Sequence, residues 1–212
     1  ASVVLDRFQP DLWKDKWLPA LWIHGHAFHW WALITSTFLH GGWLHLLGNM
    51  VVLWVFGQNV EDRFGRLWFL LFYLVGGVAA SGLHAAFSDS PAIGASGAIA
   101  AVSGAFLVLS HARSLLVFFV FIGIYSIPSW WFIVFAIARD FVFGGISDGV
   151  AHLAHLGGYT FGILISLFLL WRRILGREPY DLFTIGRQAY RRRQFKELGT
   201  RRDEAISKRL SG

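Results

Sequence analysis

The sequence contains no cysteine, which excludes disulfide bonds, thiolate metal sites and a cysteine nucleophile. Charged residues are also scarce. They make up 15% of the 212 residues, whereas soluble domains carry about 25%. Hydrophobic residues make up 55% of the chain, and many of them lie in long uninterrupted blocks. These features predict an integral membrane protein rather than a soluble one.

Five apolar blocks predict five membrane-spanning helices, and therefore an all-α, multi-pass membrane protein. About 20 residues suffice to cross a bilayer, so we expect spans over residues 42–60, 67–87, 96–112, 127–143 and 149–171. Residues 114–126 are also apolar, but Pro128 interrupts the block that contains them. We predict a buried connection there and leave its secondary structure open.

The remaining sequence predicts a division into three regions. Residues 1–37 mix charges with tryptophans and are expected to form an interfacial loop region. Residues 38–173 form the predicted transmembrane core. Residues 174–212 form a basic tail that reads as an anchor to anionic lipid rather than a nucleic-acid site.

The distribution of basic residues predicts the orientation. If the tail is cytoplasmic, 15 of the 19 Lys and Arg residues lie inside, as the positive-inside rule favours. Successive spans alternate in direction, so the first, third and fifth begin at the outer surface. Candidate polar groups near their starts then share a layer within about 10 Å of that surface.

A serine lies at the start of the third span, in the string Gly94-Ala95-Ser96-Gly97. Flanking glycines permit a sharp entry into the helix, and a helix N-terminus offers unpaired N–H groups to an oxyanion. Ser96 is therefore a candidate nucleophile. Taken alone, a serine in a membrane helix is more typical of a packing residue that bonds back to its own helix.

A histidine lies near the start of the fifth span. His155 is costly inside a membrane unless it is paired, which makes it a functional candidate. Glycines at i, i+4 spacing predict a close contact between the third and fifth spans, which would bring Ser96 toward His155. The predicted helix-packing glycines are Gly97, Gly104, Gly158 and Gly162.

Two further polar residues lie on one face of the first span, His45 and Asn49. They are candidate oxyanion donors together with Ser96, although interhelical hydrogen bonding is the alternative. A metal site would use histidines alone (His40, His45, His152 and His155). The sequence has no His-Glu-x-x-His string and the histidines have no evident carboxylate partner, so we expect no metal and no cofactor.

These motifs together resemble those of the rhomboid intramembrane serine proteases, over nearly all of residues 34–171. The resemblance is carried by four motifs in order: His40-Gly41-Gly42-Trp43-Leu44-His45-Leu46-Leu47-Gly48-Asn49, Gly57-x-x-x-Glu61-x-x-x-Gly65, Gly94-Ala95-Ser96-Gly97 and Ala154-His155-x-x-Gly158-x-x-x-Gly162. The resemblance implies a six-helix rhomboid-like bundle, of which five spans are visible. We therefore expect a further span upstream of Ala1.

The resemblance also implies an activity: hydrolysis of peptide bonds in single-span membrane proteins by a dyad of Ser96 and His155. His45, Asn49 and the Ser96 amide would hold the oxyanion. No third-member aspartate is expected, because the third and fifth spans carry no carboxylate in the layer. Ala100 stands one turn after Ser96, where some members have a tyrosine that stacks on the histidine.

We expect the protein in a bacterial inner membrane, in contact with lipid and with its C-terminus in the cytoplasm. Two alternatives stay open at this point. One is an inactive relative that binds transmembrane clients, and the other is a transporter or channel. The spans lack the mid-membrane carboxylates that are typical of ion pathways.

Overall fold

The computed structural model describes residues 18–24, 29–111, 114–119, 123–144 and 149–210. The predicted all-α membrane fold is confirmed. The described helices are α3 (Leu18–Leu21), α4 (Ala32–Thr35), the 3-10 helix η2 (Ser36–Phe38), α5 (Trp43–Phe64), α6 (Arg66–Phe87), α7 (Ser96–Leu109), α8 (Ser129–Phe143), α9 (His152–Trp171) and α10 (Leu182–Leu210). Of the predicted interfacial region, residues 1–17 and 25–28 lie outside the described residues.

Helices α5 to α9 correspond to the five predicted spans, with ends that differ by a few residues. Among the described residues, α6 and α9 are each long and apolar enough to cross a membrane. Helix α5 meets the same criterion together with α4 and η2, across a bend of 98°. Helix α7 is apolar but shorter, because it ends at Leu109 rather than at residue 112. Its 14 residues span about 21 Å.

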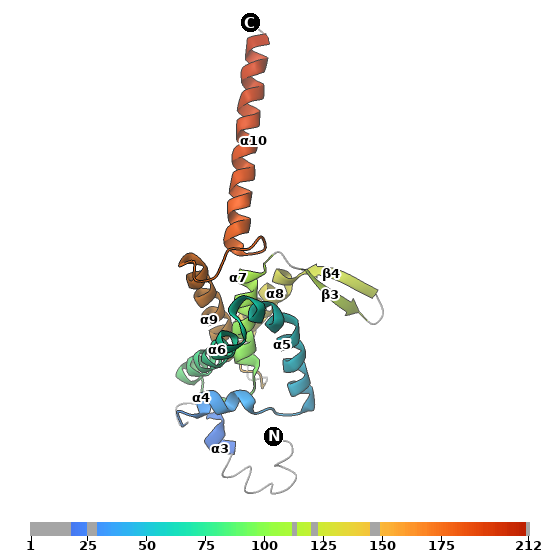
Figure 1. Cartoon of the computed structure of the whole chain (residues 1–212). Coiled ribbons are helices and arrows are strands. Elements are labelled where there is room, and N and C mark those ends of the chain that lie inside the picture. Colours follow the sequence, from blue (N-terminus) through green and yellow to red (C-terminus); the bar gives the residue numbers. More distant parts are fainter. Residues whose placement is uncertain (1–17, 25–28, 112–113, 120–122, 145–148, 211–212) are drawn as a thin grey trace.

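The prediction for residues 114–126 was incomplete, because this segment forms most of a β-hairpin. Strand β3 (Ser114–Phe119) pairs antiparallel with β4 (Gly123–Pro128). Both strands are rich in β-branched and aromatic residues, which favour extended backbone. Figure 1 shows the hairpin extending away from the helices beside α8. A second, two-residue pairing joins β1 (Ile23–His24) to β2 (Pro91–Ala92), directly before the α7 entry.

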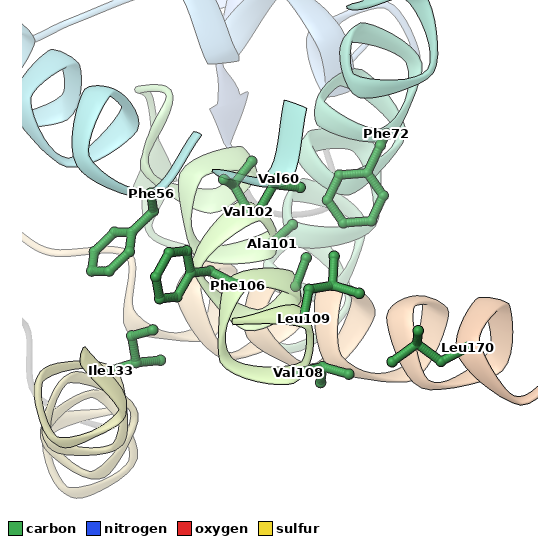
Figure 2. Packing of buried hydrophobic residues seen from close by; sticks show 11 residues of the cluster. Phe56, Val60, Phe72, Ala101, Val102, Phe106, Val108, Leu109, Ile133 and Leu170 are labelled. Carbon is green, nitrogen blue, oxygen red and sulfur yellow. The ribbon is translucent and has the colours of Figure 1, made fainter. Parts of the chain in front are cut away.

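Helix α7 forms the centre of the bundle. Twelve of its 14 residues are buried, because α5, α6, α8 and α9 all pack against it. Figure 2 shows its large side chains meeting those of the surrounding helices. The Phe106 ring lies edge-on to Phe56 of α5, with the ring centroids 5.0 Å apart. This apolar cluster fills the half of the bundle toward the C-terminal end of α7.

Glycines allow α7 and α9 to touch through their backbones. A Cβ atom at Gly158 would collide with the carbonyl oxygen of Gly97, and one at Gly162 would collide with that of Ala101. On the other side, a Cβ at Gly104 would lie 2.5 Å from the Tyr159 carbonyl oxygen. No larger residue fits these three positions without moving a helix. The backbone contact of α7 with α9 therefore begins directly below the N-terminal ends of these two helices.

The opposite end of the bundle carries the basic tail. The Arg63 guanidinium at the end of α5 donates to the Leu109 carbonyl at 3.4 Å and pairs with Glu178 at 3.1 Å. Asp181 is fully buried and caps α10, since its Oδ1 accepts from the Thr184 N–H at 2.8 Å. Figure 1 shows α10 projecting from this end, while α3 and α4 lie at the other.

Candidate active site

Ser96 is the first residue of α7 and follows a sharp turn. Gly94 adopts φ of +116°, a conformation that strongly favours glycine. Its N–H donates to the Ser36 carbonyl at 2.8 Å, which ties the turn to η2. A Cβ on Gly94 would also lie 2.8 Å from the His45 ring. This turn places the Ser96 hydroxyl at a helix N-terminus, among N–H groups that lack an intrahelical acceptor.

His155 lies in the first turn of α9 and faces Ser96. Its Nε2 atom is 2.8 Å from the Ser96 Oγ, a hydrogen-bonding distance. The His155 side chain is 12% exposed, whereas Ser96 is half-buried and lines the neighbouring cavity. The two residues are 59 positions apart in the sequence, and the α7–α9 glycine contact brings them together. Their meeting follows from the alternating span directions and the small-residue faces of the sequence.

A carboxylate that sequence analysis did not expect lies on the far side of the His155 ring. Asp140 is fully buried, and its Oδ2 lies 3.0 Å from His155 Nδ1. The sequence analysis expected no third-member aspartate because the third and fifth spans carry no carboxylate in this layer, and it did not consider α8, from which Asp140 comes. The available signal was an acidic residue inside an apolar span, which is costly without a polar partner.

The other oxygen of Asp140 is also engaged. Its Oδ1 lies 2.8 Å from His152 Nδ1 and 2.7 Å from the Arg139 guanidinium. His152 is nearly fully buried, whereas the Arg139 side chain is 47% exposed. Asp140 thus connects α8 to two histidines of α9 with both carboxylate oxygens satisfied.

The two candidate donors of α5 lie close to the Gly94 turn. A Cβ on Gly94 would lie 2.9 Å from His45 Nε2 and 3.7 Å from Asn49 Nδ2. The His45 Nδ1 accepts from the Gly41 N–H at 3.4 Å, which favours a proton on Nε2. The Asn49 Nδ2 is buried without a hydrogen-bond partner. An unpaired buried donor costs about 1–3 kcal/mol, and a bound group that accepted from this amide would relieve that cost.

A cavity of about 270 Å³ adjoins the site, and its lining includes Asn49, Ser96 and His155. Apolar side chains of α8, among them Phe132 and Phe135, also line it. Residues of four helices, α5, α7, α8 and α9, therefore surround the space beside the Ser96 hydroxyl.

Asp140, His152 and His155 are the group of described residues whose geometry could suit a metal ion. Their candidate ligand atoms lie within 4.8 Å of one another. Each histidine presents its Nδ1 to the Asp140 carboxylate, so the three groups already satisfy one another. The remaining nitrogen of His155 faces Ser96. This set differs from the histidine-only set considered from the sequence, and hydrogen bonds account for it without an ion.

Comparison with known proteins now gives the family. Residues 27–172 match the Rhomboid domain. The chain belongs to the rhomboid family. RHOMBOID-like protein 4 of Arabidopsis thaliana is 35% identical over 144 residues, covering 67% of this chain and 34% of that protein. The rhomboid protease GluP of Bacillus subtilis is 34% identical over 140 residues, covering 66% of this chain and 26% of GluP.

A shorter relative matches over more of its own length. The putative rhomboid protease YdcA of Bacillus subtilis is 31% identical over 147 residues, covering 68% of this chain and 69% of YdcA. The chain spans about a third or less of RHOMBOID-like protein 4 and GluP. As a rhomboid, the protein is integral to the membrane, and its bundle carries Asp140 beside the histidine in addition to the four sequence motifs.

Proposed function

We propose that this rhomboid is an intramembrane serine endopeptidase in which Ser96 is the nucleophile and His155 is the general base. The observation that carries the proposal is the 2.8 Å approach of His155 Nε2 to Ser96 Oγ at the N-terminus of α7. A serine hydroxyl is a weak nucleophile unless a base within hydrogen-bond reach removes its proton. The family relationship, with rhomboid proteases among the relatives, supports the same activity.

The reaction is acyl transfer in two halves. Ser96 Oγ bonds to the scissile carbonyl carbon as its proton passes to His155 Nε2, and the carbonyl oxygen becomes an oxyanion. The oxyanion collapses, the C–N bond breaks, and His155 delivers the proton to the leaving amine. Water then repeats the sequence on the ester, with His155 again as base. This returns the free Ser96 hydroxyl and releases a carboxylic acid.

The oxyanion is held by donors from two helices in this proposal. They are the Ser96 backbone N–H, the Asn49 side-chain amide and His45 Nε2. Asn49 is the best supported of these donors, because its Nδ2 is buried beside the cavity without a hydrogen-bond partner. Preorganised donors of this kind stabilise a developing charge strongly, since they do not reorganise during the step.

The proposed substrates are single-span membrane proteins that enter from the lipid. The cavity is lined on one side by apolar side chains of α8, and α5 and α8 expose large apolar residues to their surroundings. A substrate helix must unwind locally to present a bond, because helical hydrogen bonds shield its amides. Small or helix-breaking residues near the cut are therefore favoured. No cofactor and no nucleic acid take part in this mechanism.

We place the protein in a bacterial inner membrane with its C-terminus in the cytoplasm. The site lies at the α4 end of the bundle, whereas the basic tail leaves from the other end, so the site would face the outer leaflet (Figure 1). The positive-inside rule supports this orientation, because most of the basic residues lie in the tail.

A serine-directed fluorophosphonate probe tests the proposal. The wild-type protein in detergent should be labelled, and peptide mapping should find the adduct on Ser96. Ser103→Ala is the matched control, because Ser103 lines the same cavity but its hydroxyl donates to the Ile99 carbonyl of its own helix at 2.9 Å. Labelling should persist in Ser103→Ala and vanish in Ser96→Ala. An unlabelled wild type, or an adduct on another residue, would contradict the assignment and favour an inactive client-binding rhomboid.

A further inference from the structure

We propose that Asp140 is a positioning residue for His155, so that the site operates as a Ser96–His155–Asp140 triad rather than as a dyad. The inference rests on the proposed function, because it assigns a role within the same reaction. The geometry places one partner at each nitrogen of the His155 ring. One imidazole ring carries Ser96 Oγ at 2.8 Å from Nε2 and Asp140 Oδ2 at 3.0 Å from Nδ1.

The carboxylate selects the tautomer that the reaction needs. An ionised carboxylate can only accept hydrogen bonds, so it binds the form of His155 that carries its proton on Nδ1. The Nε2 lone pair is then free to accept the Ser96 hydroxyl proton. After that transfer the ring is an imidazolium, and its Nδ1–H faces a negative charge in a site with little water. Asp140 keeps its own charge throughout and exchanges no proton.

The position of Asp140 is fixed independently of His155. Its Oδ1 accepts from Arg139 at 2.7 Å and lies 2.8 Å from His152 Nδ1. The Asp140 side chain is fully buried, so it has no freedom to swing toward water. Residues whose rotamers are locked by surrounding hydrogen bonds orient a catalytic group most effectively. The contact with Asp140 also orients His155 in a chain where Ala100, one turn after Ser96, has no aromatic ring that could stack on the histidine.

The competing interpretation is that Asp140 only fastens α8 to α9. In that case the contact with His152 should matter as much as the contact with His155, since both join the same two helices. His152→Ala removes one α8–α9 contact and leaves the carboxylate opposite His155. Asp140→Asn keeps the size of the side chain but offers an N–H₂ donor, which favours the wrong His155 tautomer. The two variants therefore separate the roles.

The experiment measures kcat, KM, phosphonate labelling rate and thermal unfolding for wild type, Asp140→Asn and His152→Ala. We expect Asp140→Asn to lower kcat by about 10²–10⁴, with KM changed less than about twofold and labelling slowed by a similar factor. We expect His152→Ala to lose less than about tenfold in kcat while its unfolding temperature falls, because the Arg139 guanidinium still holds Asp140 Oδ1. An Asp140→Asn protein with turnover within about threefold of wild type would overturn the proposal.

A second measurement needs no change at Asp140. In protein labelled with ¹⁵N-histidine, the His155 signals are assigned by their loss in His155→Ala. Neutral His155 should carry its proton on Nδ1, and a proton on Nε2 would overturn the proposal. Failure of the proposed function looks different, because wild type itself would then neither cleave nor react with the probe. If wild type is active and Asp140→Asn has the same turnover, only the role of Asp140 is refuted, and the proposed protease activity stands.

Discussion

Gly158 of α9 lies against the carbonyl oxygen of Gly97 on α7, so closely that a Cβ atom cannot be placed between them. This contact lies one turn below His155 on α9 and one residue after Ser96 on α7. The separation of the two reacting groups is therefore set by a backbone contact. Side-chain flexibility cannot absorb a change at this point, because backbone atoms form both sides of the contact.

Replacing Gly158 by Leu should destabilise the protein and inactivate it together. The added side chain must push α9 away from α7, at a cost of about 3 kcal/mol, and this separates His155 from Ser96. Thermal unfolding and cleavage rate measured on the same preparation check the coupling. Gly82→Leu is the matched control, because a Cβ at that position in α6 meets no atom within 4 Å. A stable and active Gly158→Leu protein would refute the close contact.

Replacing Asn49 should change activity without changing stability. Asn49→Ala should lower kcat by about 10²–10³, the usual effect of losing one oxyanion donor, with little change in KM. Its unfolding temperature should not fall with it, because Nδ2 has no partner to lose in the free protein. His45→Ala should lower kcat in the same way. A raised KM with unchanged kcat would instead assign these residues to binding or packing.

The Gly94 turn can be tested against another glycine that has positive φ but lies in different surroundings. Gly94 and Gly65 both have positive φ, at +116° and +78°. Alanine should therefore strain either position by about 1–3 kcal/mol. A Cβ at Gly65 meets no atom within 4 Å, whereas one at Gly94 meets the His45 ring at 2.8 Å. We expect turnover to fall sharply only in Gly94→Ala. Equal turnover in both variants would show that the turn does not position His45.

The sequence predicted the helices α5 to α9 and the meeting of Ser96 with His155 for a simple physical reason. The length of an apolar block predicts where the chain crosses the bilayer. The alternating directions of the spans predict which helix ends lie at the same depth. Small residues predict which helix faces pack closely against each other. These three signals are local in the sequence, and the third rests on glycines such as Gly97 and Gly158.

The role of Asp140 was missed because the sequence predicts the depth and order of the spans but not the rotation of each helix about its own axis. The carboxylate reaches His155 only because α8 turns that face toward α9. The pairing of β3 with β4 was missed for a different reason. A short apolar run fits a buried connection or a strand equally well, and here two neighbouring halves of one apolar block pair with each other.

Cleavage in a defined bilayer tests the central claim most directly. Purified wild type and Ser96→Ala are each reconstituted into lipid vesicles with a panel of single-span proteins, and the products are analysed by mass spectrometry. The account predicts cuts within or beside the transmembrane segment for wild type. It predicts no more than a trace of product for Ser96→Ala, with nearly unchanged thermal unfolding, because a hydroxyl in a membrane helix contributes only about 1 kcal/mol. Cleavage by folded Ser96→Ala at the wild-type rate would contradict the account.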